Sequence, residues 1–380
     1  MENARIVRIE VGALEGRRPR NAGSNARRGE HGITVRVPLA RLTTDDGAQG
    51  FGVFRGSRED ATAFLGTPLS ETFSTERGGT AARWLAWDYP LWDMMAKRAG
   101  QPVYALAAAV NGHTPSTPYR APCYDTSLYF DDLDLASDDE AAALIAAEAR
   151  EGYERGHRAF KIKVGRGARY LPLDQGTRRD IAIVKAVREA VGVGSPIMLD
   201  VNNGYNLNLT KHVLTQTADD GIFWMEEPFH EDLLLYEDLR EWLECAGLPV
   251  LIADGEGDAA PQLLDWARDG VVDVIQYDIF GYGFTRWLAT GKQLDDWNAR
   301  SAPHHYGGHI GNYAAAHLAG AIRGFTYVEW DDVTTPGLDA SGYTVRDGWV
   351  EVPDTPGFGL ALDETAFRRA VETAGYDLSA

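Results

Sequence analysis

The chain has 380 residues, of which 44% are hydrophobic and 24% are charged, and its formal net charge at pH 7 is −19. This composition is typical of a globular protein with a large core, because it lacks the bias of disordered or fibrous sequences. The strong negative charge excludes nucleic acid as a partner and disfavours a membrane surface, since both bind basic proteins.

Cysteine content and hydropathy indicate the compartment. Two cysteines, Cys123 and Cys245, are too few for a disulfide framework, and neither belongs to a Cys-x-x-Cys pair. The first residues lack the apolar core of a signal peptide, and no uninterrupted apolar run is long enough to span a bilayer. These features predict a cytoplasmic protein with reduced thiols.

Apolar and polar residues alternate over residues 5–11, 32–39 and 50–55, which predicts a small antiparallel sheet. Residues 17–28, between the first two strands, carry arginines and glycine without a hydrophobic period, which predicts a mobile loop. Its arginines, Arg20 among them, either meet an anionic ligand or form a solvated charge run, and the sequence favours neither interpretation.

Residues 59–109 have helical spacing, with aromatic and aliphatic side chains recurring on one face until Gly100-Gln101-Pro102 marks an end. An aromatic stripe of this kind is typical of a protein core rather than of a cofactor site. This segment is therefore predicted to be the helical half of a small domain.

Beyond residue 119 short apolar segments alternate with longer amphipathic ones, which predicts a parallel barrel. The predicted strands are residues 121–127, 159–164, 196–201, 222–226, 249–254, 272–277, 299–303 and 326–330. The predicted helices are residues 139–152, 178–191, 210–220, 234–245, 260–269 and 283–298. Residues 343–380 are rich in turns and end in a predicted helix near residues 364–375, which we expect to return to the first domain.

Acidic residues stand at or just beyond the ends of three consecutive predicted strands, namely Asp200, Glu226 and Glu256. The carboxyl ends of the strands meet at one face of a barrel, and three carboxylates there would supply half of the oxygen shell that Mg²⁺ prefers. A single strand-end acid often caps a helix instead. Three in succession favour a metal site.

Two lysines one residue apart, Lys161 and Lys163, end the second predicted barrel strand. Lys161 and a bound cation would both lower the proton affinity of Lys163, so that its amine can act as a base near neutral pH. A base beside a metal indicates carbon-acid chemistry, because a cation on carboxylate oxygens stabilises the enediolate that forms when the α-proton is removed.

The seventh predicted strand leads into His304, and the sixth leads into Asp278. A carboxylate that accepts the imidazole N–H fixes the tautomer and raises the basicity of the ring, so the two residues are predicted to form an acid/base dyad. The second and seventh strands lie across the barrel mouth from each other, which would place Lys163 and His304 on opposite sides of a bound substrate. A zinc cluster of His304, His305 and His309 is an alternative, but the spacing fits no common zinc pattern.

These residues resemble the enolase superfamily, specifically its mandelate racemase subgroup, and the segment from residue 85 to 104 is similar to the lid-domain helix of that group. The matching positions are the lysine pair Lys161 and Lys163, the magnesium ligands Asp200, Glu226 and Glu256, the dyad of Asp278 and His304, the Asp-x-Asn residue Asn202 and the eighth-strand acid Glu329.

The resemblance implies a modified (β/α)₇β TIM barrel at residues 119–342 and an α+β capping domain at residues 1–118, completed by about residues 343–380. It implies Mg²⁺ as the cofactor, Lys163 as the base, and Glu329 as the acid that hydrogen-bonds the substrate carboxylate.

Two details of the resemblance concern the third ligand and the sixth strand. Some relatives use an aspartate near the position of Glu256, so Asp254 is the alternative third ligand. Relatives without the dyad, such as cycloisomerases and dipeptide epimerases, often carry a lysine on the sixth strand, and none occurs in residues 272–283.

Most members of the subgroup with this dyad resemble acid-sugar dehydratases. The predicted reaction is therefore the Mg²⁺-dependent dehydration of an aldonate or aldarate to a 2-keto-3-deoxy acid, in which His304 protonates the leaving hydroxyl. A racemase or epimerase of a 2-hydroxy acid would use the same enediolate and is the alternative, and a non-catalytic barrel used for binding is a weaker one. The expected partners are a small carboxylate and further copies of the chain in a homo-oligomer. The residues expected to bind the substrate are Asn202, Tyr205, His305, Tyr306 and Arg20.

Overall fold

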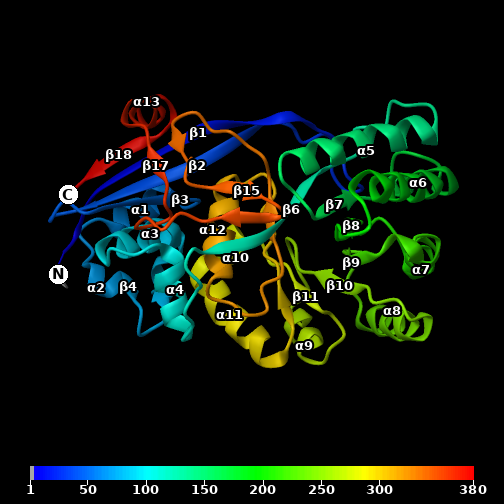
Figure 1. Ribbon diagram of the computed structural model, residues 1–380. Helices are drawn as coiled ribbons and strands as arrows, with labels where there is room; N and C mark the ends of the chain where they lie inside the picture. Colours follow the sequence, from blue (N-terminus) through cyan, green and yellow to red (C-terminus); the bar gives the residue numbers. More distant parts are fainter. Residues whose placement is uncertain (1–3) are drawn as a thin grey trace.

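The computed structural model describes residues 4–380 and shows a parallel barrel with a smaller α+β domain packed beside it (Figure 1). The barrel strands are β6 (Arg120–Leu128), β7 (Phe160–Lys163), β8 (Ile197–Asp200), β9 (Ile222–Glu226), β10 (Leu251–Asp254), β11 (Val274–Ile275), β12 (Arg300–Ser301) and β13 (Val328–Trp330). They pair in this order, and β13 returns to pair with β6. A parallel bridge between Ser301 and Phe325 closes the ring. The predicted fold class is confirmed.

Alternation along the barrel strands separates two buried layers. One inward layer contains Tyr124, Met198, Trp224 and Val274, whereas the intervening residues pack outward with the helices. The same register sets Lys163 opposite Asp200, and Asp200 opposite Glu226. The strand ends therefore bring the base and the acids predicted from the sequence to one level of the barrel.

Helices follow the barrel strands and cover their outer side (Figure 1). They are α5 (Asp138–Glu154), α6 (Leu173–Val191), α7 (Leu207–Gln216), α8 (Leu233–Ala246), α9 (Leu263–Arg268), α10 (Ile279–Tyr282), α11 (Phe284–Trp297) and α12 (Ile310–Ala319), with single turns at Arg166–Ala168 and Ala218–Asp220. The sequence did not predict α12. Its side chains from Ile310 to Leu318 are all buried, so it lacks the polar face on which helical periodicity depends.

The capping domain is built from both ends of the chain, which lie on the same side of the molecule (Figure 1). Its sheet has the order β18, β1, β2, β3, and β1 pairs antiparallel with both neighbours. These strands are β1 (Ile6–Ala22), β2 (Gly32–Thr44), β3 (Gln49–Val53) and β18 (Tyr376–Ser379). The other elements are α1 (Arg58–Phe64), α2 (Leu69–Thr72), β4 (Phe73–Ser74), β5 (Gly79–Thr80), a turn at Ala82–Trp87, α3 (Asp88–Arg98), α4 (Val103–Asn111) and α13 (Glu364–Ala374).

The prediction of a mobile loop from residue 17 was wrong in its first half. Strand β1 continues to Ala22, with Arg17 opposite Thr34 in β2. The extension is stabilised because Arg18 is buried against Asp331, which follows β13, while its neighbours Arg17 and Pro19 face solvent. Residues 23–31 alone connect β1 to β2.

The segment after the barrel contacts both parts of the molecule. The hairpin of β15 (Thr344–Arg346) and β16 (Trp349–Glu351) adds antiparallel to β6, and β14 (Leu338–Asp339) pairs with β17 (Ala361–Leu362). Helix α13 then packs on β1, as predicted. Across residues 4–380, the helices are all too short or too polar to cross a membrane.

Candidate active site

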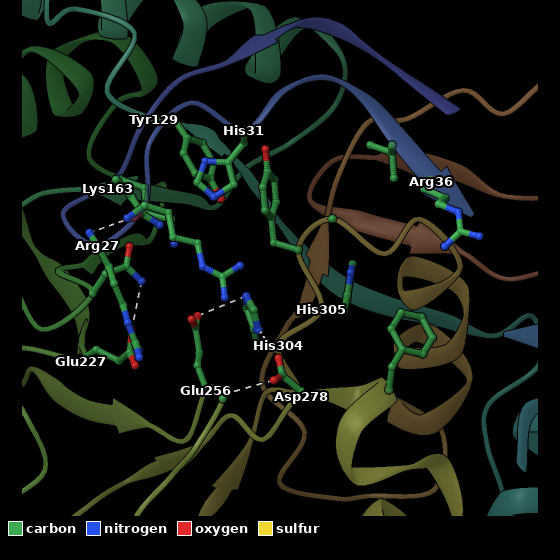
Figure 2. A pocket seen from close by; sticks show the side chains of 18 of the residues that line it. Arg27, His31, Arg36, Tyr129, Lys163, Glu227, Glu256, Asp278, His304 and His305 are labelled. Carbon is green, nitrogen blue, oxygen red and sulfur yellow. Dashed lines mark hydrogen bonds and ion pairs between the residues drawn. The ribbon is translucent and has the colours of Figure 1, made fainter. Parts of the chain in front are cut away.

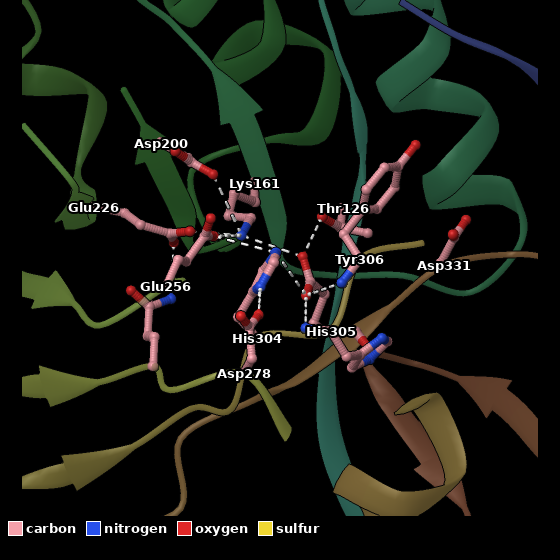
Figure 3. Close-up of polar contacts among 12 residues, drawn as sticks. Thr126, Lys161, Asp200, Glu226, Glu256, Asp278, His304, His305, Tyr306 and Asp331 are labelled. Atoms are coloured by element: carbon pink, nitrogen blue, oxygen red, sulfur yellow. Dashed lines mark hydrogen bonds and ion pairs between the residues drawn. The ribbon is translucent and has the colours of Figure 1, made fainter. Parts of the chain in front are cut away.

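Carboxylates from neighbouring strands converge at the barrel mouth (Figure 3). Asp200 ends β8, Glu226 ends β9, and Glu256 follows β10 after Gly255, whose φ of +130° suits glycine. One oxygen from each of the three acids lies within 4.8 Å of the others. Glu256 Oε1 is buried, and no hydrogen bond to it is found within residues 4–380. An all-oxygen donor set with an unsatisfied buried carboxylate fits a hard cation such as Mg²⁺.

Asp254 lies outside this group. Its carboxylate accepts hydrogen bonds from the Tyr236 hydroxyl and from the Gly255 N–H. The geometry therefore favours Glu256 over Asp254 as the third ligand.

The electrostatics of the group favour a divalent cation. Burial, and then the charge of Asp200, hold the pKa of Glu226 well above its usual range. Burial would also raise the pKa of Asp200, but Lys163 and Lys161 outweigh it and lower the value to about 2. Lys161 Nζ lies 2.7 Å from Glu226 Oε1 and 3.2 Å from Glu329 Oε1, so its positive charge is already divided between these two carboxylates. A bound cation would relieve the remaining repulsion.

Two residues that the sequence analysis did not identify hold Glu226 in place. Trp224 Nε1 and Gln276 Nε2 each donate to Glu226 Oε2 over 2.9 Å. Both side chains are fully buried. Trp224 precedes Glu226 by two residues on the same strand, so the alternation of side chains along a strand places both on the inward face. This spacing is the sequence signal that could have identified Trp224.

The proposed base, Lys163, projects from the end of β7 into the cavity. Its ammonium group pairs with Asp200 and lies 5.3 Å from the ring centroid of Tyr129. Burial and Lys161 both act to lower the pKa of Lys163, as predicted for Lys161, but in this structure Asp200 outweighs them and raises it. Asp200 is also an expected metal ligand, so its carboxylate would be shared between the lysine and the cation.

His304 and Asp278 lie side by side after β12 and β11 (Figures 2 and 3). His304 Nδ1 is 2.5 Å from Asp278 Oδ1, and a parallel backbone bridge fixes the two residues. Nδ1 therefore donates to the carboxylate, and Nε2, 3.3 Å from Glu256 Oε1, faces the metal site. Burial opposes ionisation, but Glu256, Glu329 and Asp278 together raise the pKa of His304 to about 10.

The alternative zinc cluster does not form. His305 Nε2 is 2.5 Å from the Glu329 carbonyl oxygen. His309 Nδ1 is 2.8 Å from Thr335 Oγ1, and its Nε2 contacts Tyr313. Among the described residues, the acid group of Asp200, Glu226 and Glu256 is the cluster with metal-binding geometry.

Glu329 lies beneath the site in β13 and is fully buried. Its Oε1 accepts from Thr126 Oγ1 over 2.7 Å, and its Oε2 accepts from the N–H groups of His305 and Tyr306 over 2.7 and 3.0 Å. Burial acts against ionisation, but Lys161 and then His304 hold the pKa of Glu329 well below its usual range. These contacts orient the backbone that follows His304.

A cavity of about 470 Å³ separates this site from the capping domain (Figure 2). We call the capping-domain residues that line it the roof. The roof consists of Arg18, Asn25, Arg27, Arg28, His31, Thr34, Val35, Arg36 and Arg55. The barrel side includes Tyr129, Lys163, Asn202, Glu227, Glu256, Asp278, Phe280, His304, His305 and Tyr306.

The structure brings some of the predicted substrate-binding residues to this cavity and leaves others away from it. Asn202, His305 and Tyr306 line it. Tyr205 instead donates to Asp180 over 2.8 Å, and Arg20 donates to Ser127. The cavity receives other arginines of the predicted loop, and His31, which the sequence analysis did not identify.

Residues 144–366, more than half of the chain, match the family model described as enolase C-terminal domain-like. The chain belongs to this family. The resemblance to the enolase superfamily inferred from the lysine pair, the acids and the dyad is therefore confirmed.

Relatives of known structure extend the match to the whole chain. Galacturonate dehydratase from Geobacillus sp., in complex with D-galacturonate and 5-keto-4-deoxy-D-galacturonate, is 46% identical, with 100% of both chains covered and a TM-score of 0.95. A mandelate racemase/muconate lactonizing protein from Geobacillus sp. Y412MC10, in complex with magnesium and tartrate, is 46% identical over 100% of this chain and 98% of its own, with a TM-score of 0.97. D-galactarolactone cycloisomerase of Agrobacterium fabrum (strain C58) is 28% identical over 294 residues, 73% of this chain and 71% of that protein.

Proposed function

We propose that the protein is a Mg²⁺-dependent acid-sugar dehydratase, and that D-galacturonate is the first substrate to test. The observation that carries the proposal is a lysine and an aspartate-bound histidine at one carboxylate metal site, each from a different barrel strand. The 46% identity over the whole chain to a galacturonate dehydratase supports the same reaction. A uronate shares with aldonates and aldarates the carboxylate next to a carbinol on which this chemistry depends.

The reaction follows from the placement of the two groups. Lys163 removes the proton α to the carboxylate, and the electron pair moves into the carboxylate to form an enediolate. Collapse of the enediolate expels the β-hydroxyl, which leaves as water with a proton from His304 Nε2. The resulting enol rearranges to a ketone. For galacturonate this sequence yields the 5-keto-4-deoxy acid that the Geobacillus structure contains.

Asp200, Glu226 and Glu256 would hold the magnesium ion. When bound, the ion supplies positive charge that stabilises the charge developing on the substrate carboxylate. Lys161, paired with Glu226 and Glu329, would add a fixed positive charge on the same side. Asp278 keeps Nε2 of His304 directed at the site throughout.

The test uses the full chain with Mg²⁺ and a panel of uronates, aldonates and aldarates in D₂O. We expect one acid sugar to lose water and give a keto-deoxy product by NMR, and we expect a chelator to stop the reaction and added Mg²⁺ to restore it. Exchange of the α-proton with inversion and without loss of water would indicate the racemase instead. If no panel member exchanges or loses water, the proposed function is refuted.

A further inference from the structure

His31 projects from the roof into the cavity, on the side where Tyr129 and Lys163 lie (Figure 2). It is the last residue before β2, and its ring packs against Tyr129 and Tyr306 with centroid separations of 4.9 and 5.4 Å. The proposed mechanism does not use this side chain.

The hydrogen bonding of His31 fixes its tautomer. Nδ1 lies 2.9 Å from the carbonyl oxygen of Gly23, and because a carbonyl only accepts, Nδ1 carries a proton. Burial lowers the pKa of His31, and the cations Lys163, Arg18 and Arg28 lower it further, against the opposing bond to Gly23. A ring that is neutral near pH 7 leaves Nε2 as an acceptor. Within residues 4–380 no hydrogen bond to Nε2 is found.

The acceptor on His31 matters because its arginine neighbours in the roof can only donate hydrogen bonds. Arginine side chains of the roof donate hydrogen bonds and accept none. The Oδ1 of Asn25 is already used, since it accepts from the N–H groups of Arg27 and Arg28 over 3.0 and 2.6 Å. An acid sugar presents hydroxyl hydrogens as well as oxygens, so it needs acceptors among these donors.

The segment that carries His31 is anchored at both sides. The His31 N–H donates to Ala22 over 3.0 Å, and the Ser24 carbonyl accepts from the N–H of Phe130, just beyond β6, over 2.9 Å. The Arg27 carbonyl accepts from Arg169 over 3.1 Å. The direction of Nε2 is therefore set by the fold, which is the condition for choosing one hydroxyl over others.

We propose that His31 is a specificity-determining residue whose Nε2 accepts a hydrogen bond from a substrate hydroxyl that is not expelled in the reaction. The inference rests on the proposed function and adds to it a group that recognises the acid sugar from the roof side of the cavity. It explains how a roof rich in arginines selects a polyhydroxylated anion rather than any small carboxylate.

The test compares His31→Phe and His31→Gln with wild type, on D-galacturonate and on analogues that each lack one of the hydroxyls that are not expelled. Phe keeps the packing against Tyr129 and Tyr306 and removes the acceptor, whereas the Gln amide restores an acceptor at similar reach. We expect His31→Phe to raise KM for the parent about tenfold, with kcat changed less than about twofold, the size of effect of one lost hydrogen bond. For one deoxy analogue the KM values of wild type and His31→Phe should coincide, and His31→Gln should recover part of the loss.

His212→Phe, on the exposed face of α7, is the matched control and should leave both constants unchanged. Thermal melting checks that each variant is folded. Equal KM values for wild type and His31→Phe on every substrate, or a fall in kcat with KM constant, would overturn the assignment. A wild type that dehydrates no acid sugar would refute the proposed function itself, and with it the ligand assigned to His31.

Discussion

At the scale of single residues, the proposed base and the proposed acid of the site can be separated by experiment because different carboxylates hold them. Lys163 pairs with Asp200, and His304 pairs with Asp278. We expect Lys163→Ala to lose both α-proton exchange and dehydration, and His304→Asn to lose dehydration while retaining exchange. Each loss should be about 10²- to 10⁴-fold, the usual contribution of a positioned acid or base. NMR on one sample measures deuterium incorporation, which reports α-proton exchange, and product formation, which reports dehydration.

The control for His304→Asn is His212→Asn, which changes an exposed histidine of α7 and should retain full activity. Magnesium affinity should persist in both site variants, since neither removes a carboxylate of the metal group. Full dehydration by either site variant would contradict the assigned roles.

Gln276 allows a second test at the scale of single residues, which concerns metal binding rather than proton transfer. Its Nε2 fixes Glu226 Oε2 from a fully buried position. We expect Gln276→Leu to weaken Mg²⁺ binding about 10- to 100-fold, because residues that orient a ligand contribute this much to affinity. Titration calorimetry measures the change directly, with Gln216→Leu, at an exposed position at the end of α7, as the control. Equal affinity in the two variants would show that Gln276 does not position the ligand.

At the scale of elements, one buried ion pair ties the end of β1 to the segment after β13. Arg18 and Asp331 are 6% and 2% exposed and lie 2.9 Å apart. We expect Asp331→Ala to lower the free energy of unfolding by about 3–5 kcal/mol, since it leaves a buried guanidinium without its partner. Asp265→Ala, which breaks the exposed pair with Arg268, should change it by less than about 1 kcal/mol. Chemical denaturation measures the free energy of unfolding of both variants, and an equal loss in the two would contradict the stabilising role of the buried ion pair.

A second link between elements is sensitive to pH. His157, before β7, is fully buried and lies 3.3 Å from Asp332, after β13. Burial alone would lower its pKa, but Asp332 raises it to about 10. Between the unfolded value of about 6.5 and that value the native state holds the extra proton, so stability should fall as pH rises, by up to about 1.4 kcal/mol per pH unit. Denaturation of wild type and His157→Gln across this range should give a steeper slope for wild type. Parallel slopes would refute the linkage.

Sequence periodicity predicted the barrel strands and most of their helices, because each strand is a short apolar run and each surrounding helix has a polar face. It failed where burial is complete or where a charge is buried. Helix α12 has no polar face to reveal a period. The first strand was predicted for residues 5–11 with a loop from Arg17, whereas β1 continues to Ala22. Its far end was missed because Arg18 finds its partner at Asp331, far along the chain, and local sequence contains no sign of that pair.

For the site, too, some residues could be predicted from the sequence and others could not. Asp200, Glu226 and Glu256 could be predicted because strand ends of a parallel barrel meet at one face, and they do converge. Tyr205 could not be excluded from the substrate-binding residues on sequence alone, since what turns its hydroxyl away from the cavity is a hydrogen bond to Asp180 in α6. His31 was missed because its proposed role as an acceptor depends on the Gly23 carbonyl that fixes its tautomer, and that contact exists only in the folded loop.

At the scale of the whole molecule, the two domains contribute different parts of the site. The carboxylates that would hold the metal all come from the barrel, whereas the roof comes from the capping domain. The formal charge of −19 repels an anionic substrate at long range. On the proposed function, the arginines of the roof would therefore attract the substrate at short range, once it has entered between the domains.

This division predicts different responses of the two domains to ligands. In Lys163→Ala, which leaves the substrate intact, Mg²⁺ alone should slow amide hydrogen exchange at the barrel strand ends near residues 200–205 and 254–257. Only Mg²⁺ with D-galacturonate should slow exchange in residues 23–36, because the substrate, and not the ion, contacts the roof. Helix α13, on the far side of β1, serves as the internal control and should not respond. Protection of residues 23–36 by Mg²⁺ alone would show that the metal orders the roof without substrate, and would contradict the division of roles between the domains.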